Sequence, residues 1–335
     1  MNLKKASIEI NFIIKNQLMS ILIKKRNITR IFNKFKRQGI MGSIKATLIT
    51  ILRFVYRSSF FRIFINPTLT RKIIFAVICG YFPNYHNPKT LNEKLYIAKT
   101  SHPHELSHIV TDKWHVREYV KEKGFKHILN EVHYITDSPP SIPFNKLPNE
   151  FVIKSNYSGS SEQVILVSDR SRLNYRKIIK TCENWLHINS INSRQHSDPI
   201  VSKIKPLIIV EKLLKESKFK FPLDFKYYIF GRQIQFIEVI QGRFSGGTYA
   251  TIYDKDWNRL DFTHGHPAGK NINKPINLVE MNEIALKLSS DFTFARIDLY
   301  NLDGKKIFFG EITINPGILP FSPRKYDEVF GGCCK

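Results

Sequence analysis

The stretch FARIDLYNLDGKKIFFGEITINPG, residues 294–317, decides the fold that we expect for the rest of the chain. Its alternating apolar residues predict a β-hairpin with strands over 295–300 and 306–314, joined by a turn over 301–304. The Pro-Gly pair at 316–317 ends the second strand. The stretch therefore predicts two paired antiparallel strands near the C-terminal end of the sequence.

The hairpin carries polar side chains at strand spacing. Arg296 and Asp298 lie two residues apart on the first strand, so both point to one face of the sheet. Glu311 and Thr313 have the same spacing on the second strand, and Asn315 follows near its end. Mg²⁺ takes oxygen ligands and usually binds one or two carboxylates together with substrate phosphates. The hairpin fits such a site, but an ordinary amphipathic hairpin with solvated charges has the same pattern.

The composition excludes several classes of protein. The chain of 335 residues is 42% hydrophobic, which is enough for a sizeable core and for two or three lobes. Its four cysteines include no CxxC pair, which argues against a disulfide scaffold and against a zinc site. This cysteine usage indicates a reducing compartment, so we expect a cytoplasmic protein.

Positive charge is concentrated toward the N-terminus. Residues 1–86 contain 16 lysines and arginines and a single acid, Glu9, in a chain of net charge +24. Charge interrupts the apolar runs well before the roughly 18 residues that a membrane-spanning helix needs, and no signal-peptide cleavage pattern follows them. We predict a basic, apolar-rich helical segment over 1–81 that either lies on an anionic membrane surface or caps the main domain. No nucleic-acid-binding motif accompanies the charge, so we expect no nucleic-acid partner.

Residues 82–150 are expected to form a helical region ahead of the main domain. The pattern predicts a helix over 111–123 that ends at Gly124. Lys113 and Arg117 lie four residues apart on it and share a face. This pair fits either phosphate binding or a charged exterior.

A second basic position precedes a loop rich in glycine and serine. Lys154 ends a predicted strand over 151–154, and Gly159, Ser160 and Ser161 follow in the loop. Glycine lets the backbone approach a ligand closely, and backbone N–H groups together with hydroxyls can hold anionic oxygens. The segment fits a phosphate-binding loop, and it also fits a plain hairpin loop.

The second half of the chain is expected to be an α+β domain over 151–328 with a largely antiparallel sheet, followed by a tail over 329–335. Hydrophobic periodicity separates its strands from its helices. The predicted strands lie over 206–214, 224–230, 233–240 and 248–253, and the predicted helices over 171–187 and 278–289.

These motifs, in this order, resemble the ATP-grasp superfamily over residues 105–320. IKSNYSGSS at 153–161 and the hairpin at 294–317 resemble corresponding motifs of D-alanine–D-alanine ligases. Over residues 82–328 the chain is similar to the TupA-like ATP-grasp family, which is associated with teichuronic acid, capsule and other surface polysaccharides. The blocks that carry this similarity are NPKTLNEKL, DKWHVREYVKEKG, KLPNEFVIKSN, DFKYYIFGR, YDKDWNRL and FFGEITINPG. The resemblance implies two α+β lobes that grip a nucleotide, with ATP and Mg²⁺ as cofactors.

The resemblance also implies which residues contact the nucleotide. Lys154 would bind the α- and β-phosphates, with Lys113 as a second basic group and Arg117 beside it. The remaining positions implied for nucleotide binding are the loop residues Gly159, Ser160 and Ser161, and at the adenine Glu211 with the backbone of Lys212 and Leu213. The acid at the ribose is left open between Glu216 and Asp224.

At the hairpin the resemblance implies that Asp298 and Glu311 hold Mg²⁺ and that Arg296 steadies the phosphoryl group or its acceptor. The ligases place asparagine two residues after the metal glutamate, where this chain has Thr313, so either Thr313 or Asn315 would complete the metal shell. A further lysine of the ligases has three possible counterparts here, namely Lys226, Arg243 and Lys255.

The implied reaction is an ATP-dependent ligation of a carboxylate to an amine or a hydroxyl through an acylphosphate. The acceptor would be a sugar or amino acid on a surface-polysaccharide precursor at the cytoplasmic membrane face. A glycosyltransferase is the alternative, because Asp254 and Asp256 have the DxD spacing of many sugar-nucleotide transferases, although two turn-forming aspartates give the same spacing. A third alternative is a non-catalytic membrane-bound scaffold.

Overall fold

The computed structural model describes residues 44, 47, 48, 51, 67–101, 104–157, 163–195, 203–216, 222–242 and 247–334. The chain divides into two compact units, Met1–Pro88 and Lys89–Lys335. In the first unit, helix α4 (Pro67–Cys79) ends at Gly80, which has a positive φ of 83°. Most of the predicted segment 1–81 lies outside the described residues. Among the residues that are described, no helix is long and apolar enough to cross a membrane.

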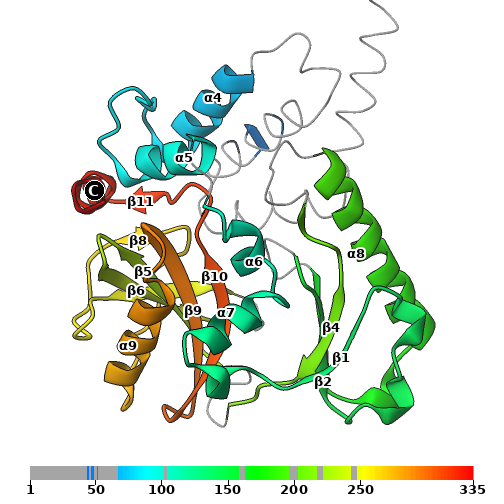
Figure 1. Ribbon diagram of the computed structural model, residues 1–335. Helices are drawn as coiled ribbons and strands as arrows, with labels where there is room; N and C mark the ends of the chain where they lie inside the picture. The colour runs from blue at the N-terminus through cyan, green and yellow to red at the C-terminus, as the bar shows by residue number, and fades with distance from the viewer. Residues whose placement is uncertain are drawn as a thin grey trace, which may run out of the picture. The chain divides into compact units, whose positions relative to one another are not determined.

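The second unit contains a five-stranded antiparallel sheet in the order β10-β9-β5-β6-β7 (Figure 1). The predicted hairpin is confirmed as its β9–β10 pair, in which Lys306 pairs with Leu302 next to the turn. The expected α+β class and the antiparallel pairing are also confirmed. The strands are β5 (Asp224–Phe230), β6 (Gln233–Gln241), β7 (Tyr249–Tyr253), β9 (Phe294–Leu302) and β10 (Lys306–Thr313).

Helix α9 (Leu278–Leu288) packs on one face of this sheet. Its buried residues recur every three or four positions, which gives the helix one apolar side. The strands contribute alternate residues to the same core, among them Tyr227, Ile237 and Ile297, each with 0% of its surface exposed.

The opposite face of the sheet is apolar at one end and charged toward the other. At the apolar end, Tyr228, Phe230 and Phe236 pack with Phe321 and Phe330. The elements that cover this end are helices α5 (Leu91–Ser101) and α10 (Lys325–Cys333), and β11 (Phe321–Ser322), which pairs with β8 (Thr263–His264). The charged end of this face carries the candidate site described below.

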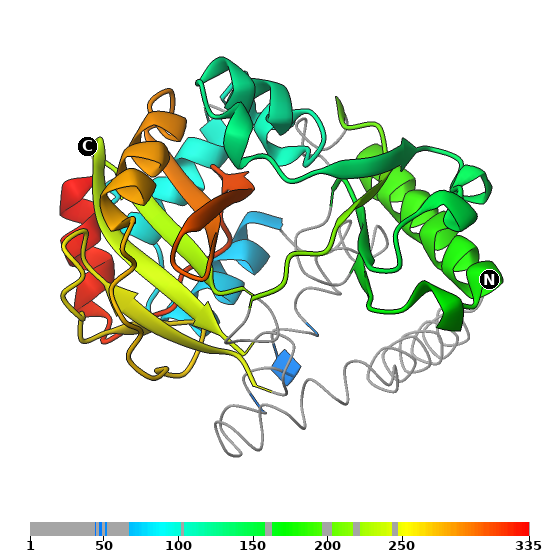
Figure 2. The same cartoon turned by 90° about the horizontal axis from the view of Figure 1, so that it is seen from below.

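A four-stranded antiparallel sheet forms the other lobe of this unit, in the order β1-β4-β2-β3. Helix α8 (Tyr175–Gln195) packs on it through Ile178, Cys182 and Trp185, and Figure 2 shows the helix running along the sheet. The strands are β1 (Val132–Thr136), β2 (Phe151–Ser155), β3 (Val164–Val167) and β4 (Ile208–Lys212). Short 3₁₀ helices lie before β1 at η1 (Lys126–Ile128), between β1 and β2 at η2 (Pro139–Ser141) and η3 (Phe144–Lys146), and after β3 at η5 (Arg170–Arg172).

Three sequence-based predictions need correction. The region 82–150 is not wholly helical, because strand β1 lies within it and pairs with β4. The predicted helix over 111–123 is two helices, α6 (Ser107–Thr111) and α7 (Val116–Glu122), which are separated by a turn at 112–115. The predicted tail over 329–335 is wrong as far as Cys333, because helix α10 extends to that residue.

Helix α10 is held in place by hydrogen bonds as well as by its apolar side. Asn92 of α5 donates its backbone N–H and its side-chain Nδ2 to the Asp327 carboxylate, at 3.0 and 2.8 Å. The same side chain accepts from the backbone N–H of Leu319 at 2.7 Å and donates to its C=O at 2.8 Å. These bonds anchor the segment that follows β10, and they explain why the C-terminal residues are ordered instead of frayed.

Candidate functional site

The β9–β10 hairpin brings its two carboxylates together. Glu311 lies opposite Asp298 in the register, next to a β-bulge between Phe309 and Glu311. Gly310 occupies the bulge, where a side-chain Cβ would lie 2.9 Å from the backbone oxygen of Asp298. The glycine therefore permits the close approach of the two strands that places the carboxylates side by side.

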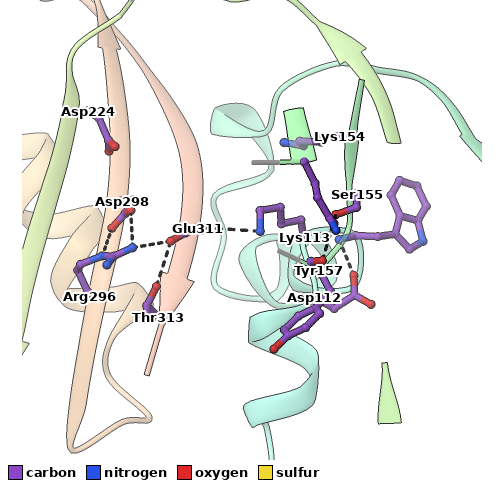
Figure 3. A network of polar contacts seen from close by, with 12 residues as sticks. Asp112, Lys113, Lys154, Ser155, Tyr157, Asp224, Arg296, Asp298, Glu311 and Thr313 are labelled. Atoms are coloured by element: carbon purple, nitrogen blue, oxygen red, sulfur yellow. Dashed lines mark hydrogen bonds and ion pairs between the residues drawn. The ribbon is translucent and has the colours of Figure 1, made fainter. Parts of the chain in front are cut away.

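Arg296 connects the two carboxylates. Its Nε donates to Oδ1 of Asp298 at 2.6 Å and its Nη2 to Oδ2 at 2.8 Å, while Nη2 also donates to Oε1 of Glu311. The Thr313 hydroxyl donates to the same Glu311 oxygen at 3.2 Å. Asn315 lies beyond the end of β10 and is half-buried. One guanidinium thus stands between two acids, as Figure 3 shows.

Strand β5 adds Lys226 to this network. Its Nζ donates to Asp298 and lies 3.1 Å from Oδ2 of Asp224. Of the two possible counterparts of the ligase lysine that the structure describes, Lys226 lies beside the metal-binding candidates. Lys255 forms an exposed pair with Asp256 instead, and Arg243 lies outside the described residues. Asp224, one of the two possible ribose-binding acids, lies on the same strand as Lys226 and belongs to the same group of charged side chains.

Two lysines approach from the other side of the site (Figure 3). Lys113, in the turn between α6 and α7, points toward the hairpin, and its Nζ lies 3.8 Å from Oε2 of Glu311. Lys154, on β2, donates to Oε1 of Glu211 on β4 at 2.6 Å. The Glu211 carboxylate therefore faces a lysine rather than open space. The predicted loop residues Gly159, Ser160 and Ser161 lie outside the described residues.

The backbone at the end of β4 is hydrogen-bonded to the segment before β1. The N–H of Lys212 donates to the C=O of Glu131 at 2.9 Å, and the Asn130 side chain donates to the C=O of Lys212 at 2.9 Å. Arg117 donates to the C=O of Asn130 at 2.9 Å, which ties α7 to this edge. Lys212 is the last residue of β4, and Leu213 lies just past the strand.

Charge and burial shift several pKa values in this network. Burial alone would raise the pKa of Glu311, but Lys113, Arg296 and Lys226 outweigh it and lower the pKa to about 2. Burial lowers the pKa of Lys113, and the nearby charge of Lys154 acts in the same direction. Burial raises the pKa of Asp298 against the opposing effect of its cationic neighbours. Glu311 is thus strongly favoured as an anion, as a cation ligand should be.

Sequence reasoning missed Glu238 on β6, which lies opposite Lys226 in the register and is 2% exposed. Its Oε2 accepts from the Tyr228 hydroxyl at 3.3 Å and lies 3.4 Å from Nε2 of His264. Burial raises the pKa of Glu238 to about 7, and burial together with Arg296 and Lys226 lowers the pKa of His264 to about 3. The sequence did contain a signal for this residue, because Glu238 is the only acid in the largely apolar strand sequence QIQFIEVI.

The DxD-like pair forms a turn. Oδ1 of Asp254 accepts from the backbone N–H groups of Asp256 and Asn258 at 2.9 and 2.7 Å, and Oδ2 accepts from Nδ2 of Asn258 at 2.8 Å. Asp256 pairs with Lys255 at the surface. Because both oxygens of Asp254 are used inside the turn, this geometry favours the turn-forming interpretation.

The part of the chain that the structure describes contains no group of three or more His, Cys, Asp or Glu residues arranged to hold a metal. The candidate metal ligands are the two hairpin carboxylates that the family resemblance implies, Asp298 and Glu311. Such a pair suits an ion that takes most of its remaining ligands from water or phosphate, which is how Mg²⁺ usually binds.

Comparison with solved structures gives matches of low identity. A D-alanine–D-alanine ligase from Bacillus anthracis, complexed with ATP, is 17% identical with a TM-score of 0.39, over 62% of this chain and 56% of that one. The ATP-grasp ligase PsnB, complexed with a variant precursor, Mg and ADP, is 11% identical with a TM-score of 0.40, over 73% of this chain and 65% of that one. VanG D-Ala:D-Ser ligase from Enterococcus faecalis is 14% identical with a TM-score of 0.37, over 62% and 53%. The chain thus spans between half and two thirds of the length of these proteins.

Comparison with protein families gives a match over most of the chain. No curated protein matches the sequence. The sequence profile described as TupA-like ATPgrasp matches residues 93–335, which include both sheets and every described residue of the charged network. The chain therefore belongs to the TupA-like ATP-grasp family.

Proposed function

We propose that this protein is an ATP- and Mg²⁺-dependent ligase that activates a carboxylate as an acylphosphate and transfers the acyl group to an amine or a hydroxyl. The observation that carries the proposal is the ionic network in which Lys113 faces Glu311 while Arg296 joins Glu311 to Asp298. Two acids and two basic groups, one of them from the α6–α7 turn, suit a polyphosphate and its metal ion. The family to which the chain belongs supports the same chemistry.

The hairpin fits Mg²⁺ by the chemistry of its donors. Asp298 and Glu311 offer only oxygen, lie opposite each other in the register, and already share the positive charge of Arg296 between them. Thr313 is the nearer candidate for a third ligand, because its hydroxyl contacts Glu311, and Asn315 is the other. When bound, Mg²⁺ would offset the negative charge that develops on the transferring phosphoryl group.

The basic residues would do the positioning. Lys113 and Lys154 would bind the phosphates of ATP, Arg296 would steady the transferring group, and Lys226 would keep Asp298 in place from β5. The loop with Gly159, Ser160 and Ser161 would add backbone and hydroxyl donors, and residues from Glu211 to Leu213 would border the adenine. No nucleophilic serine or cysteine is required.

The proposed reaction has two steps. An oxygen of the acceptor carboxylate attacks the γ-phosphorus of ATP, the bond to the β-phosphate oxygen breaks, and ADP leaves. The amine or hydroxyl then attacks the acyl carbon, phosphate leaves with the bonding electrons, and the proton of the nucleophile passes to solvent. The products are ADP, phosphate and an amide or an ester. We place the acceptor on a precursor of a surface polysaccharide in the cytoplasm, as the family resemblance implies.

Lys154→Ala tests the nucleotide part of this proposal. Hydrogen bonds to charged groups contribute about 1.5–3 kcal/mol, so we expect the variant to bind Mg-ATP at least about tenfold more weakly. Isothermal titration calorimetry of the 335-residue chain measures this. Lys121→Ala is the matched control, because Lys121 also pairs with a glutamate, Glu118 at 2.7 Å, but lies on α7 and has no predicted role in nucleotide binding. Binding of a nucleotide sugar without any binding of ATP would reject the ligase in favour of a glycosyltransferase.

We also propose that the basic N-terminal segment holds the protein at the cytoplasmic face of an anionic membrane. Residues 1–86 carry 16 basic residues against one acid, and each lysine or arginine near such a surface contributes about 1 kcal/mol. Deleting residues 1–80 is expected to abolish co-sedimentation with phosphatidylserine vesicles at low salt. A deletion variant that sediments as well as the intact chain rejects the membrane role.

A further inference from the structure

The turn between α6 and α7 is built around a buried aspartate that no predicted role explains. Asp112 is 1% exposed. Its Oδ1 accepts from the backbone N–H groups of Trp114 and His115, at 2.8 and 3.3 Å. Its Oδ2 accepts from Nδ2 of Asn156 at 2.8 Å and lies 2.8 Å from Nδ1 of His115. Both oxygens are thus occupied, and one of these contacts leads to a different part of the fold.

Asn156, 0% exposed, joins three segments that are far apart in the sequence. Besides the bond to Asp112, its Nδ2 donates to the C=O of Lys205 at 2.9 Å and its Oδ1 accepts from the N–H of Leu207 at 2.8 Å. Its own N–H donates to the C=O of Leu207, and its C=O accepts from the N–H of Lys113, both at 2.9 Å. The residue therefore ties the end of β2 to the segment before β4 and to the α6–α7 turn.

This arrangement fixes the backbone of both lysines of the candidate site. Lys113 follows Asp112 directly, and its own N–H is bound by Asn156, while Lys154 lies two residues before Asn156 on β2. Two ammonium groups brought close together repel each other, and the nearby charge of Lys154 adds to burial in lowering the pKa of Lys113. The buried Asp112–Asn156 contact is a rigid support that holds the backbone of both lysines in place before a phosphate binds.

We infer that Asp112 and Asn156 are positioning residues that hold Lys113 and Lys154 together as a two-ammonium site for the phosphates of a nucleoside di- or triphosphate. The inference rests on the proposed function, because it takes the two lysines as phosphate ligands. On this inference, losing the Asp112–Asn156 contact weakens the binding of the phosphates and does not weaken the binding of adenine near Leu213.

Asp112→Asn tests the inference, because it keeps the size of the side chain but removes its charge and replaces one acceptor by a donor that faces Nδ2 of Asn156. We expect Mg-ADP to bind the variant about tenfold more weakly and adenosine to bind within about twofold of the unchanged chain. The quantity that decides is the ratio of the two dissociation constants, measured on the same preparation. A general loosening of the fold would weaken both ligands, whereas a lost phosphate site weakens only Mg-ADP.

Asp169→Asn is the matched control. Asp169 lies just before the 3₁₀ helix η5, and its Oδ1 likewise accepts from a backbone N–H two residues ahead, that of Ser171 at 2.9 Å. It should leave the ratio unchanged. If Asp112→Asn does not fold, His115→Ala replaces it. The side chain of His115 is 55% exposed and contributes a single contact to Asp112, so a change of about two- to threefold in the same direction is expected.

The outcomes separate the inference from the proposed function. An unchanged chain that binds no Mg-ADP rejects the proposed function, and the inference with it. An unchanged chain that binds Mg-ADP, together with a folded variant whose ratio of dissociation constants is unaltered, overturns the inference alone.

Discussion

Replacing Asp298 with alanine is expected to lower the free energy of unfolding by about 3–5 kcal/mol. Asp298 is 3% exposed and pairs with two basic side chains, Arg296 and Lys226, the latter 7% exposed. Removing the carboxylate leaves both charges buried with fewer partners, and that desolvation cost exceeds the loss of an ordinary contact. Urea unfolding of the 335-residue chain, followed by tryptophan fluorescence, measures the change.

Two controls separate the charge effect from a simple loss of packing. Combining Asp298→Ala with Lys226→Met removes one of the stranded charges and should recover part of the stability. Asp256→Ala removes an acid from an exposed pair, in which the side chains of Lys255 and Asp256 are 61% and 64% exposed. This substitution should lower the free energy of unfolding by less than about 1 kcal/mol. If the Asp298→Ala variant and the double variant are equally unstable, the explanation by unpaired charge is wrong.

The sequence was most informative where a pattern and its turn are local. The hairpin could be predicted because period-two alternation defines each strand and the Asn-Leu-Asp-Gly turn joins them within a few residues. Strand β5 was also predicted with its observed bounds. In each case the residues that form the element lie next to one another in the chain.

The sequence was least informative where a contact depends on distant residues. Lys154 and Glu211 are 57 positions apart, so alternation alone could not reveal that they face each other across paired strands. Strand β1 forms a sheet edge whose partner is β4, and nothing within VHYIT identifies that partner. The break at Asp112 was obscured because apolar residues on both sides continue a helical pattern, although an aspartate that bonds the N–H groups two and three residues ahead is a known helix-start signal.

The second large effect is expected at Glu238, whose carboxyl is buried with Tyr228 and His264. Burial raises the pKa of this group from the ordinary value of 4.5 to about 7 in the folded protein. Between these two values the folded chain keeps a proton that the unfolded chain has released, so stability falls as the pH rises. Below pH 4.5 the group is protonated in both states and costs nothing. Above pH 7 the full cost of burying the charge is present.

Glu238→Gln should therefore stabilise the protein in a pH-dependent way. At pH 8 we expect the variant to be more stable than the unchanged chain by about 3 kcal/mol, since each tenfold change in proton affinity is about 1.4 kcal/mol. At pH 4.5 the difference should largely vanish. Urea unfolding at several pH values measures it, and Glu280→Gln, at an exposed position of α9, controls for the substitution itself. A stability difference that stays constant between pH 5 and pH 8 would show that the folded protein does not hold Glu238 as a protonated acid. A retained proton would in turn mean that the row of charged side chains across β9, β5 and β6 ends in a neutral group, which leaves Lys226 and Arg296 to balance the charges of Asp224 and Asp298.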